Sequence, residues 1–172
     1  MRALLALLGL ALPLHVVRSQ SRPDFSGEWT RVDSATEQRS VAAVGDASFR
    51  VGNMGSGWGS PLTLRQEGNR LVVEYSHFST YDLQPKLRFV YALDGSESRN
   101  TVMIGHAESV LRSRATWSDS SLVITTTFAV PPGVAGGDVR HVLILTSSTS
   151  LIVETTRPGI APTTVRTIYT RR

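Results

Sequence analysis

The chain has 172 residues, no cysteine, 41% hydrophobic residues and a formal net charge of +4. This length suits one domain with its own hydrophobic core, and the lack of cysteine excludes a disulfide scaffold, a cysteine zinc site and a thiol nucleophile. The basic residues are scattered singly, with Arg171-Arg172 as the only adjacent pair. Nucleic-acid-binding proteins carry a clustered basic stripe, so no nucleic-acid partner is expected.

The first nineteen residues have the pattern of an export signal. Met1-Arg2 is a short basic start, residues 3–17 are mainly apolar, and Ser19 follows as a small residue for cleavage. The apolar run is shorter than a membrane span requires. We therefore predict a signal peptide over 1–19 and a single mature domain over 20–172, with no membrane span after its removal. Losing two arginines leaves 16 basic against 14 acidic residues, a net charge near +2. A domain of this size without disulfides favours a bacterial periplasmic or secreted location.

The mature chain opens with a predicted short strand over 25–32, in which Trp29 is a large core residue. Ser34-Ala-Thr-Glu37 is a capping-box pattern and predicts a short helix that ends at Gly45. The glycine-rich stretch 46–60 carries Trp58. This stretch is interpreted either as a lid or plug, or as a surface loop that tucks in a few apolar side chains.

A β-hairpin is predicted over 61–77. Apolar residues alternate with polar ones on both sides of Gly68-Asn69, and alternation with a period of two means that one face of each strand is buried. Glycine and asparagine tolerate the backbone conformations that a tight hairpin turn requires.

Later segments repeat this pattern. Alternating runs occupy residues 87–93, 101–104, 111–117, 122–128, 139–145, 151–155 and 165–169. Short links between successive strands favour pairing of chain neighbours, and closing the sheet removes its edges. The sequence therefore predicts an all-β fold, an up-and-down antiparallel β-barrel of about 8–10 strands, with the short helix or lid after the first strand. A two-sheet sandwich is the structural alternative.

The segment Phe25-Ser-Gly-Glu-Trp29 resembles the opening of the calycins, the group that contains the lipocalins and the intracellular fatty-acid-binding proteins. The likeness to the fatty-acid-binding proteins extends to the helical insertion, the hairpin over 61–76, the turn after Trp117 and the ending Val165-Arg-Thr-Ile-Tyr169. It covers nearly the whole mature chain. The resemblance implies a barrel that holds a hydrophobic or amphipathic molecule.

Many fatty-acid-binding proteins fix the ligand carboxylate with an Arg-x-Tyr pair on the last strand and a second arginine on an earlier strand. Here Tyr169 matches the tyrosine, but the arginine positions fall on Thr167 and Thr126. Arg166 is one residue away, and such a slip directs a strand side chain to the opposite face. The resemblance with these departures therefore implies a neutral or weakly polar ligand.

The predicted inward rows give a candidate cavity lining. Its members are Tyr75, His77, Phe89, Tyr91, Trp117, Thr126, Phe128, His141, Thr167 and Tyr169. A mostly apolar pocket with a few polar groups is typical of small-molecule sites. In the alternative, these side chains simply fill the barrel, as they do in narrow barrels; ten strands enclose a wider interior and favour the cavity.

No catalytic or metal motif is recognised. The stretch Gly55–Ser60 is neither a nucleophile elbow nor a phosphate loop. His77 and His141 could bind a metal or haem only if both reached a shared point; otherwise each is a half-solvated histidine near a barrel end. We expect no cofactor and no enzymatic activity.

The leading hypothesis is an exported monomer that binds a small lipophilic molecule without catalysis. The alternative is a solid-core barrel that acts as an extracytoplasmic structural or protein-interaction module.

Overall fold

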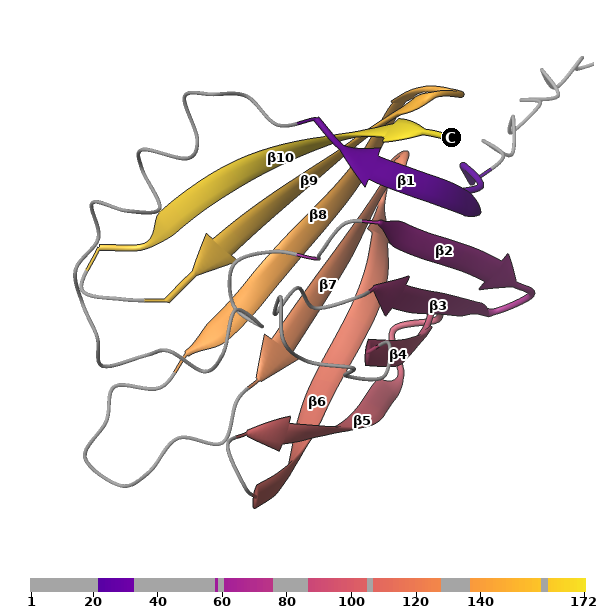
Figure 1. Ribbon diagram of the computed structural model, residues 1–172. Coiled ribbons are helices and arrows are strands. Elements are labelled where there is room, and N and C mark those ends of the chain that lie inside the picture. Colours follow the sequence, from indigo (N-terminus) through magenta and orange to yellow (C-terminus); the bar gives the residue numbers. More distant parts are fainter. Residues whose placement is uncertain are drawn as a thin grey trace, which may run out of the picture.

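The computed structural model describes residues 22–32, 58, 61–75, 87–104, 107–127, 137–158 and 161–172. These ranges contain ten strands (Figure 1). Buried and exposed side chains alternate most clearly along β7 and along the start of β8. The strands are β1 (Gly27–Arg31), β2 (Leu62–Glu67), β3 (Arg70–Tyr75), β4 (Leu87–Ala92), β5 (Glu97–Ile104), β6 (Ala107–Ser118), β7 (Ser121–Thr127), β8 (Asp138–Ser147), β9 (Ser150–Arg157) and β10 (Thr163–Arg171).

All ten strands belong to one antiparallel sheet in the order β4-β3-β2-β1-β10-β9-β8-β7-β6-β5. Successive strands pair with each other, apart from β4 and β5, and β1 also pairs with the last strand, β10. The sheet curls into a nearly closed barrel (Figure 1), so the predicted all-β up-and-down architecture is confirmed. The helix predicted over 34–45 lies outside the described residues. Within the described ranges, no helix has the length and apolar character to cross a membrane.

Two predicted strands begin well after the observed start. The strand expected over 111–117 is β6, which begins at Ala107. We expected a strand over 101–104, whereas β5 begins at Glu97 and pairs residue by residue with β6 as far as Ile104. The inward side chains at its start are the polar Ser98 and Asn100, both buried. Because that buried row is polar, the strand lacks the apolar alternation by which the others were found.

Ser98 and Asn100 join the two ends of the sheet. The Asn100 side chain copies a strand partner, because its Oδ1 accepts from the Val90 amide at 2.8 Å and its Nδ2 donates to the Val90 carbonyl at 3.2 Å. Ser98 Oγ accepts from the Ala92 amide at 2.8 Å. Unpaired strand edges promote association with other chains. Two side chains of β5 therefore satisfy backbone groups of β4 that no neighbouring strand pairs.

Substituting Asn100 by alanine is expected to lower the free energy of unfolding by about 2 kcal/mol, because both backbone groups of Val90 lose their buried partner. Urea unfolding followed by circular dichroism measures the change. Asn69→Ala is the matched control. The Asn69 side-chain amide also donates a hydrogen bond to a residue distant in sequence, Asp94, at 2.9 Å, but this bond is exposed. Equal losses in the two variants would contradict a special role for Asn100 at the seam.

One end of the barrel is filled by aromatic side chains next to the N-terminal segment. Trp29 is fully buried and donates from Nε1 to the Phe25 carbonyl at 3.0 Å, and Phe25 stacks on Trp117 with ring centroids 5.9 Å apart. The Arg171 guanidinium lies 4.8 Å from the centre of the Trp29 ring. Arg22 lies 5.3 Å from that of Trp117. This end is therefore closed by three aromatic side chains, and an arginine lies over each of the two tryptophan rings.

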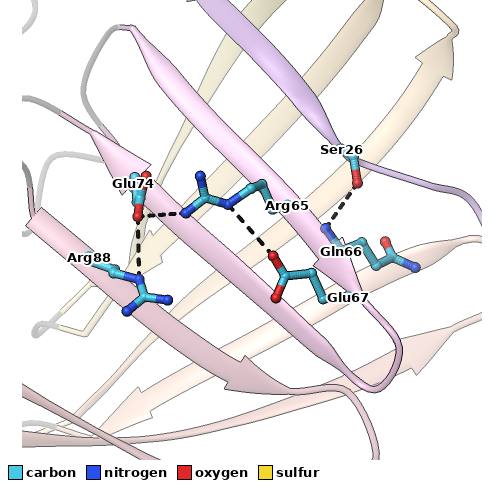
Figure 2. A network of polar contacts seen from close by, with 6 residues as sticks. All are labelled: Ser26, Arg65, Gln66, Glu67, Glu74 and Arg88. Carbon is cyan, nitrogen blue, oxygen red and sulfur yellow. Dashed lines mark hydrogen bonds and ion pairs between the residues drawn. The ribbon is translucent and has the colours of Figure 1, made fainter.

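Charged side chains cover the outer face of β2, β3 and β4 (Figure 2). Glu74 Oε1 accepts from Arg65 Nη2 at 2.8 Å and lies 3.3 Å from Arg88 Nε. Arg65 also lies 3.8 Å from a Glu67 oxygen. On the next residue of β2, the Gln66 backbone N–H donates to Ser26 Oγ at 2.9 Å (Figure 2). This hydrogen bond connects the N-terminal segment to the barrel.

We expect Glu74→Gln to lower the free energy of unfolding by about 0.5–1 kcal/mol in low salt, because one carboxylate serves two arginines on neighbouring strands. The loss should shrink in 1 M salt, where exposed charges are screened. Glu67→Gln is the control, since this carboxylate is more exposed and makes only the longer contact. A Glu74 effect that is independent of salt would show that packing, and not charge, is responsible.

Candidate functional site

The structure describes eight of the ten residues predicted to line the interior. Seven of them are buried on the inner rows: Tyr75, Phe89, Tyr91, Thr126, His141, Thr167 and Tyr169. Trp117 is half-buried and packs against the core at the aromatic end. His77 and Phe128 lie outside the described residues. The eight described side chains are thus buried or packed against the core, and their role as a ligand lining stays a prediction.

Three aromatic rings form one wall of the interior on β3 and β4. Tyr75 stacks on Phe89 with centroids 5.9 Å apart, and Phe89 stacks on Tyr91 at 6.4 Å. The register places Phe89 and Tyr91 opposite Val73 and Leu71 on β3. Burial raises the pKa of Tyr75 to about 12. Burial, followed by the nearby Tyr75, also raises the pKa of Tyr91. Both phenols are therefore neutral at physiological pH, and this wall offers an apolar surface.

The opposite side of the interior, on β5 to β10, carries buried polar residues. Some of these have hydrogen-bonding partners within the barrel: Ser113 Oγ and Thr126 Oγ1 lie 2.9 Å apart, and Ser98 and Asn100 bond to β4. Buried polar groups in native proteins are normally paired in this way. These four residues are accounted for by the fold itself.

His141 differs from them because neither ring nitrogen has a hydrogen-bonding partner among the described residues. Its side chain is only 6% exposed. Directly across the strand pair on β9 lies Thr155, whose Oγ1 is also buried and unpaired. Two residues further along β9, Arg157 has a buried Nε that finds no partner in the part of the chain that the structure describes. Unpaired polar atoms therefore gather at one place on neighbouring strands.

The His141 ring is covered by Trp58. The two rings stack with centroids 5.3 Å apart and an interplanar angle of 14°. The Tyr169 hydroxyl donates to the Trp58 carbonyl, which links this residue to β10. Trp58 is 5% exposed, so this residue of the predicted lid or plug does enter the barrel. The rest of that stretch is outside the described residues.

The electrostatics of the cluster keep His141 uncharged. Burial, followed by repulsion from Arg157, lowers the pKa of His141 to about 4. Burial also lowers the pKa of Arg157, although a guanidinium stays protonated in proteins. At neutral pH the site therefore presents one imidazole N–H, one imidazole lone pair, one hydroxyl and one cationic donor.

Sequence reasoning missed Thr155 and Arg157 as site residues. A signal for both was present, because they continue the inward row of Leu151 and Val153 on every second residue of β9. Thr126 and Thr167, at the positions where the resemblance implies arginines, are buried on the inner rows. A different arginine, Arg157, lies at the end of β9 on this inward row.

No described group of three or more histidine, aspartate or glutamate residues has an arrangement that could hold a metal ion. A shared site of His77 and His141 stays untested, because His77 lies outside the described residues. The described polar groups at His141, which are the imidazole, the Thr155 hydroxyl and the Arg157 guanidinium, are suited to hydrogen bonding.

The barrel agrees with the calycin resemblance at the level of architecture. Comparisons with protein-family models and with curated proteins find no match for this chain. The calycin likeness therefore stays a resemblance, which rests on the barrel, on Trp29 at the first strand and on the order of the motifs.

Proposed function

We propose that this chain is an exported, non-catalytic β-barrel protein that binds a small lipophilic molecule, neutral or weakly polar, in its interior. The observation that carries the proposal is His141: a buried side chain whose two ring nitrogens have no hydrogen-bonding partner among the described residues, beside the unpaired Thr155 hydroxyl. Leaving a buried polar group unpaired costs about 1–3 kcal/mol. A bound molecule that supplies the missing partner would recover that cost.

The aromatic wall and Trp58 support an apolar ligand body. Tyr75, Phe89 and Tyr91 present neutral rings, and the Trp58 ring stacks on His141. Ligand sites in barrels usually combine such apolar surface with a few polar groups that fix orientation. Thr126 and Thr167 in place of arginines favour a ligand without a permanent charge at those two positions.

Native mass spectrometry tests this function on protein exported to a bacterial periplasm from the full chain and purified without detergent. We expect an extra mass that disappears on denaturation, and a polypeptide that begins at Gln20 after removal of residues 1–19. Fragmentation of the extra mass would identify the class of ligand. An apo mass together with no uptake of any lipophilic probe would overturn the proposal.

A second candidate function is a solid-core barrel that serves as a structural or protein-interaction module. It is favoured by an aliphatic strip on the outer surface, where Val32 and Ile168 are 44% and 43% exposed and the Val32 amide donates to the Ile168 carbonyl at 2.9 Å. Ile152 lies next to Ile168 in the strand register but is only 6% exposed, so the exposed part of the strip is Val32 and Ile168. Charged substitutions at Ile168 should abolish partner binding if this function is right, and should leave ligand binding unchanged.

A further inference from the structure

The unpaired atoms of His141 on β8 and of Thr155 and Arg157 on β9 indicate which chemical group of a ligand could bind to them. This argument rests on the proposed function and concerns the same interior. Arg157 Nε can only donate a hydrogen bond, Thr155 Oγ1 can donate, and neutral His141 donates from one ring nitrogen. A group that faces all three must therefore accept hydrogen bonds.

The strand register brings the three side chains within reach of one small group. His141 and Thr155 are a directly opposed pair, and such pairs hold their Cβ atoms about 5 Å apart. Arg157 is two residues beyond Thr155 on the same face of β9, which separates the two positions by about 7 Å. One oxygen atom with two lone pairs can accept hydrogen bonds from His141 and Thr155, and the long Arg157 side chain can reach the same group.

The positive charge of Arg157 restricts the class of ligand group further. Arg157 has no carboxylate among its described contacts, and its Nε is removed from water. A buried donor on a cation is satisfied best by a polar oxygen, because hydrogen bonds to charged groups are about twice as strong as neutral ones. An amine or ammonium group would be repelled, and a pure hydrocarbon would leave all three donors unpaired.

We propose that His141, Thr155 and Arg157 hold the carbonyl or carboxyl oxygen at the polar end of a lipophilic ligand. Trp58, stacked on His141, covers this end. The aromatic wall of Tyr75, Phe89 and Tyr91 contacts the apolar remainder. The ligand class is thus a medium-to-long chain or ring system that ends in an ester, ketone or amide, or in an acid that is bound in its neutral form.

The test compares three probes of matched chain length: dodecanoic acid, methyl dodecanoate and dodecane, each delivered from cyclodextrin to the exported protein. Quenching of tryptophan fluorescence and native mass spectrometry measure binding. We expect the acid and the ester to bind about tenfold or more tightly than dodecane, the factor that one satisfied buried hydrogen bond provides. A higher affinity for the acid than for the ester would identify Arg157 as a charge partner.

Two variants locate the polar end. Thr155→Val removes the hydroxyl and Arg157→Met removes the guanidinium, each at nearly constant volume, and each should weaken acid and ester binding by about five- to tenfold while leaving dodecane unchanged. Arg140→Met is the matched control, because Arg140 precedes His141 on β8 but is exposed on the outer face. Thr155→Val should also leave the ligand-free protein as stable as before, or more so, since it removes an unpaired hydroxyl.

The outcomes separate the two proposals. Equal binding of all three probes, unaffected by both variants, would overturn the carbonyl site while the barrel remained a ligand-binding protein. Failure of all three probes to bind would overturn the proposed function and this inference together. Circular dichroism checks that each variant is folded, and either variant alone is sufficient for the decision.

Discussion

Replacing Trp29 by alanine is expected to lower the free energy of unfolding by about 4 kcal/mol. The ring is fully buried, its Nε1 donates to the Phe25 carbonyl at 3.0 Å, and the Arg171 guanidinium lies over its face at 4.8 Å. The residue pairs with Leu62 on β2 and with Arg171 on β10, where the first and last strands meet. Its removal leaves a large cavity and an unpaired carbonyl, and Trp→Ala changes in cores cost about 3–5 kcal/mol.

Urea unfolding of the purified protein measures this loss, with an unchanged dependence on denaturant concentration as the sign of an intact fold. Trp117→Ala is the control at the same end of the barrel, because Trp117 is half-buried and its Nε1 has no partner. We expect a clearly smaller loss there. Similar losses in both variants would mean that total aromatic volume, and not the Trp29 position, stabilises this end.

Acidification should destabilise the protein through His141. Its pKa in the folded protein is about 4, against about 6.5 for an unfolded histidine. Between these values the unfolded chain binds more protons, so the free energy of unfolding falls as the pH drops from about 6.5 to 4 and is not reduced further by this group below that. A difference of this size corresponds to about 3 kcal/mol.

The described charged group that faces His141 is Arg157 on β9, and its opposite neighbour on β7 is the apolar Ile124. Asp24, Asp94 and Glu97 also titrate in the acid range with lowered pKa values. His141→Phe keeps a ring against Trp58 and retains these carboxylates. Subtracting its pH profile from that of the parent isolates the histidine, and identical profiles would contradict a buried neutral imidazole.

Ligand binding and the titration of His141 are coupled. A ligand oxygen that accepts from His141 satisfies its N–H without charging the ring, so binding of an ester should leave the pH dependence of stability in place. A carboxylate beside the ring favours the charged form and should raise the histidine pKa. The pH profile of the acid-loaded protein therefore also reports which atom lies next to His141.

The strands were predictable because their signal is local. Alternation over runs such as 87–93 and 122–128 reflects a side-chain period of two that needs no knowledge of the partner strand. Short turns such as Gly68-Asn69, where Gly68 has φ 57°, fixed which strands are neighbours. Where a buried row is polar, as at Ser98 and Asn100, the local signal failed and the start of β5 was missed.

By itself, the sequence determined an all-β, up-and-down barrel with Trp29 in its core and the inward rows of its strands. Only the tertiary structure decided which inward polar groups find partners, because that depends on register between strands and on contacts between distant segments. Tyr169 reaches Trp58 across 111 residues, Asn100 closes the seam on Val90, and Thr155 comes to lie opposite His141. Hydrogen bonding is satisfied in three dimensions, and so the unpaired cluster at His141 could be recognised only in the folded barrel.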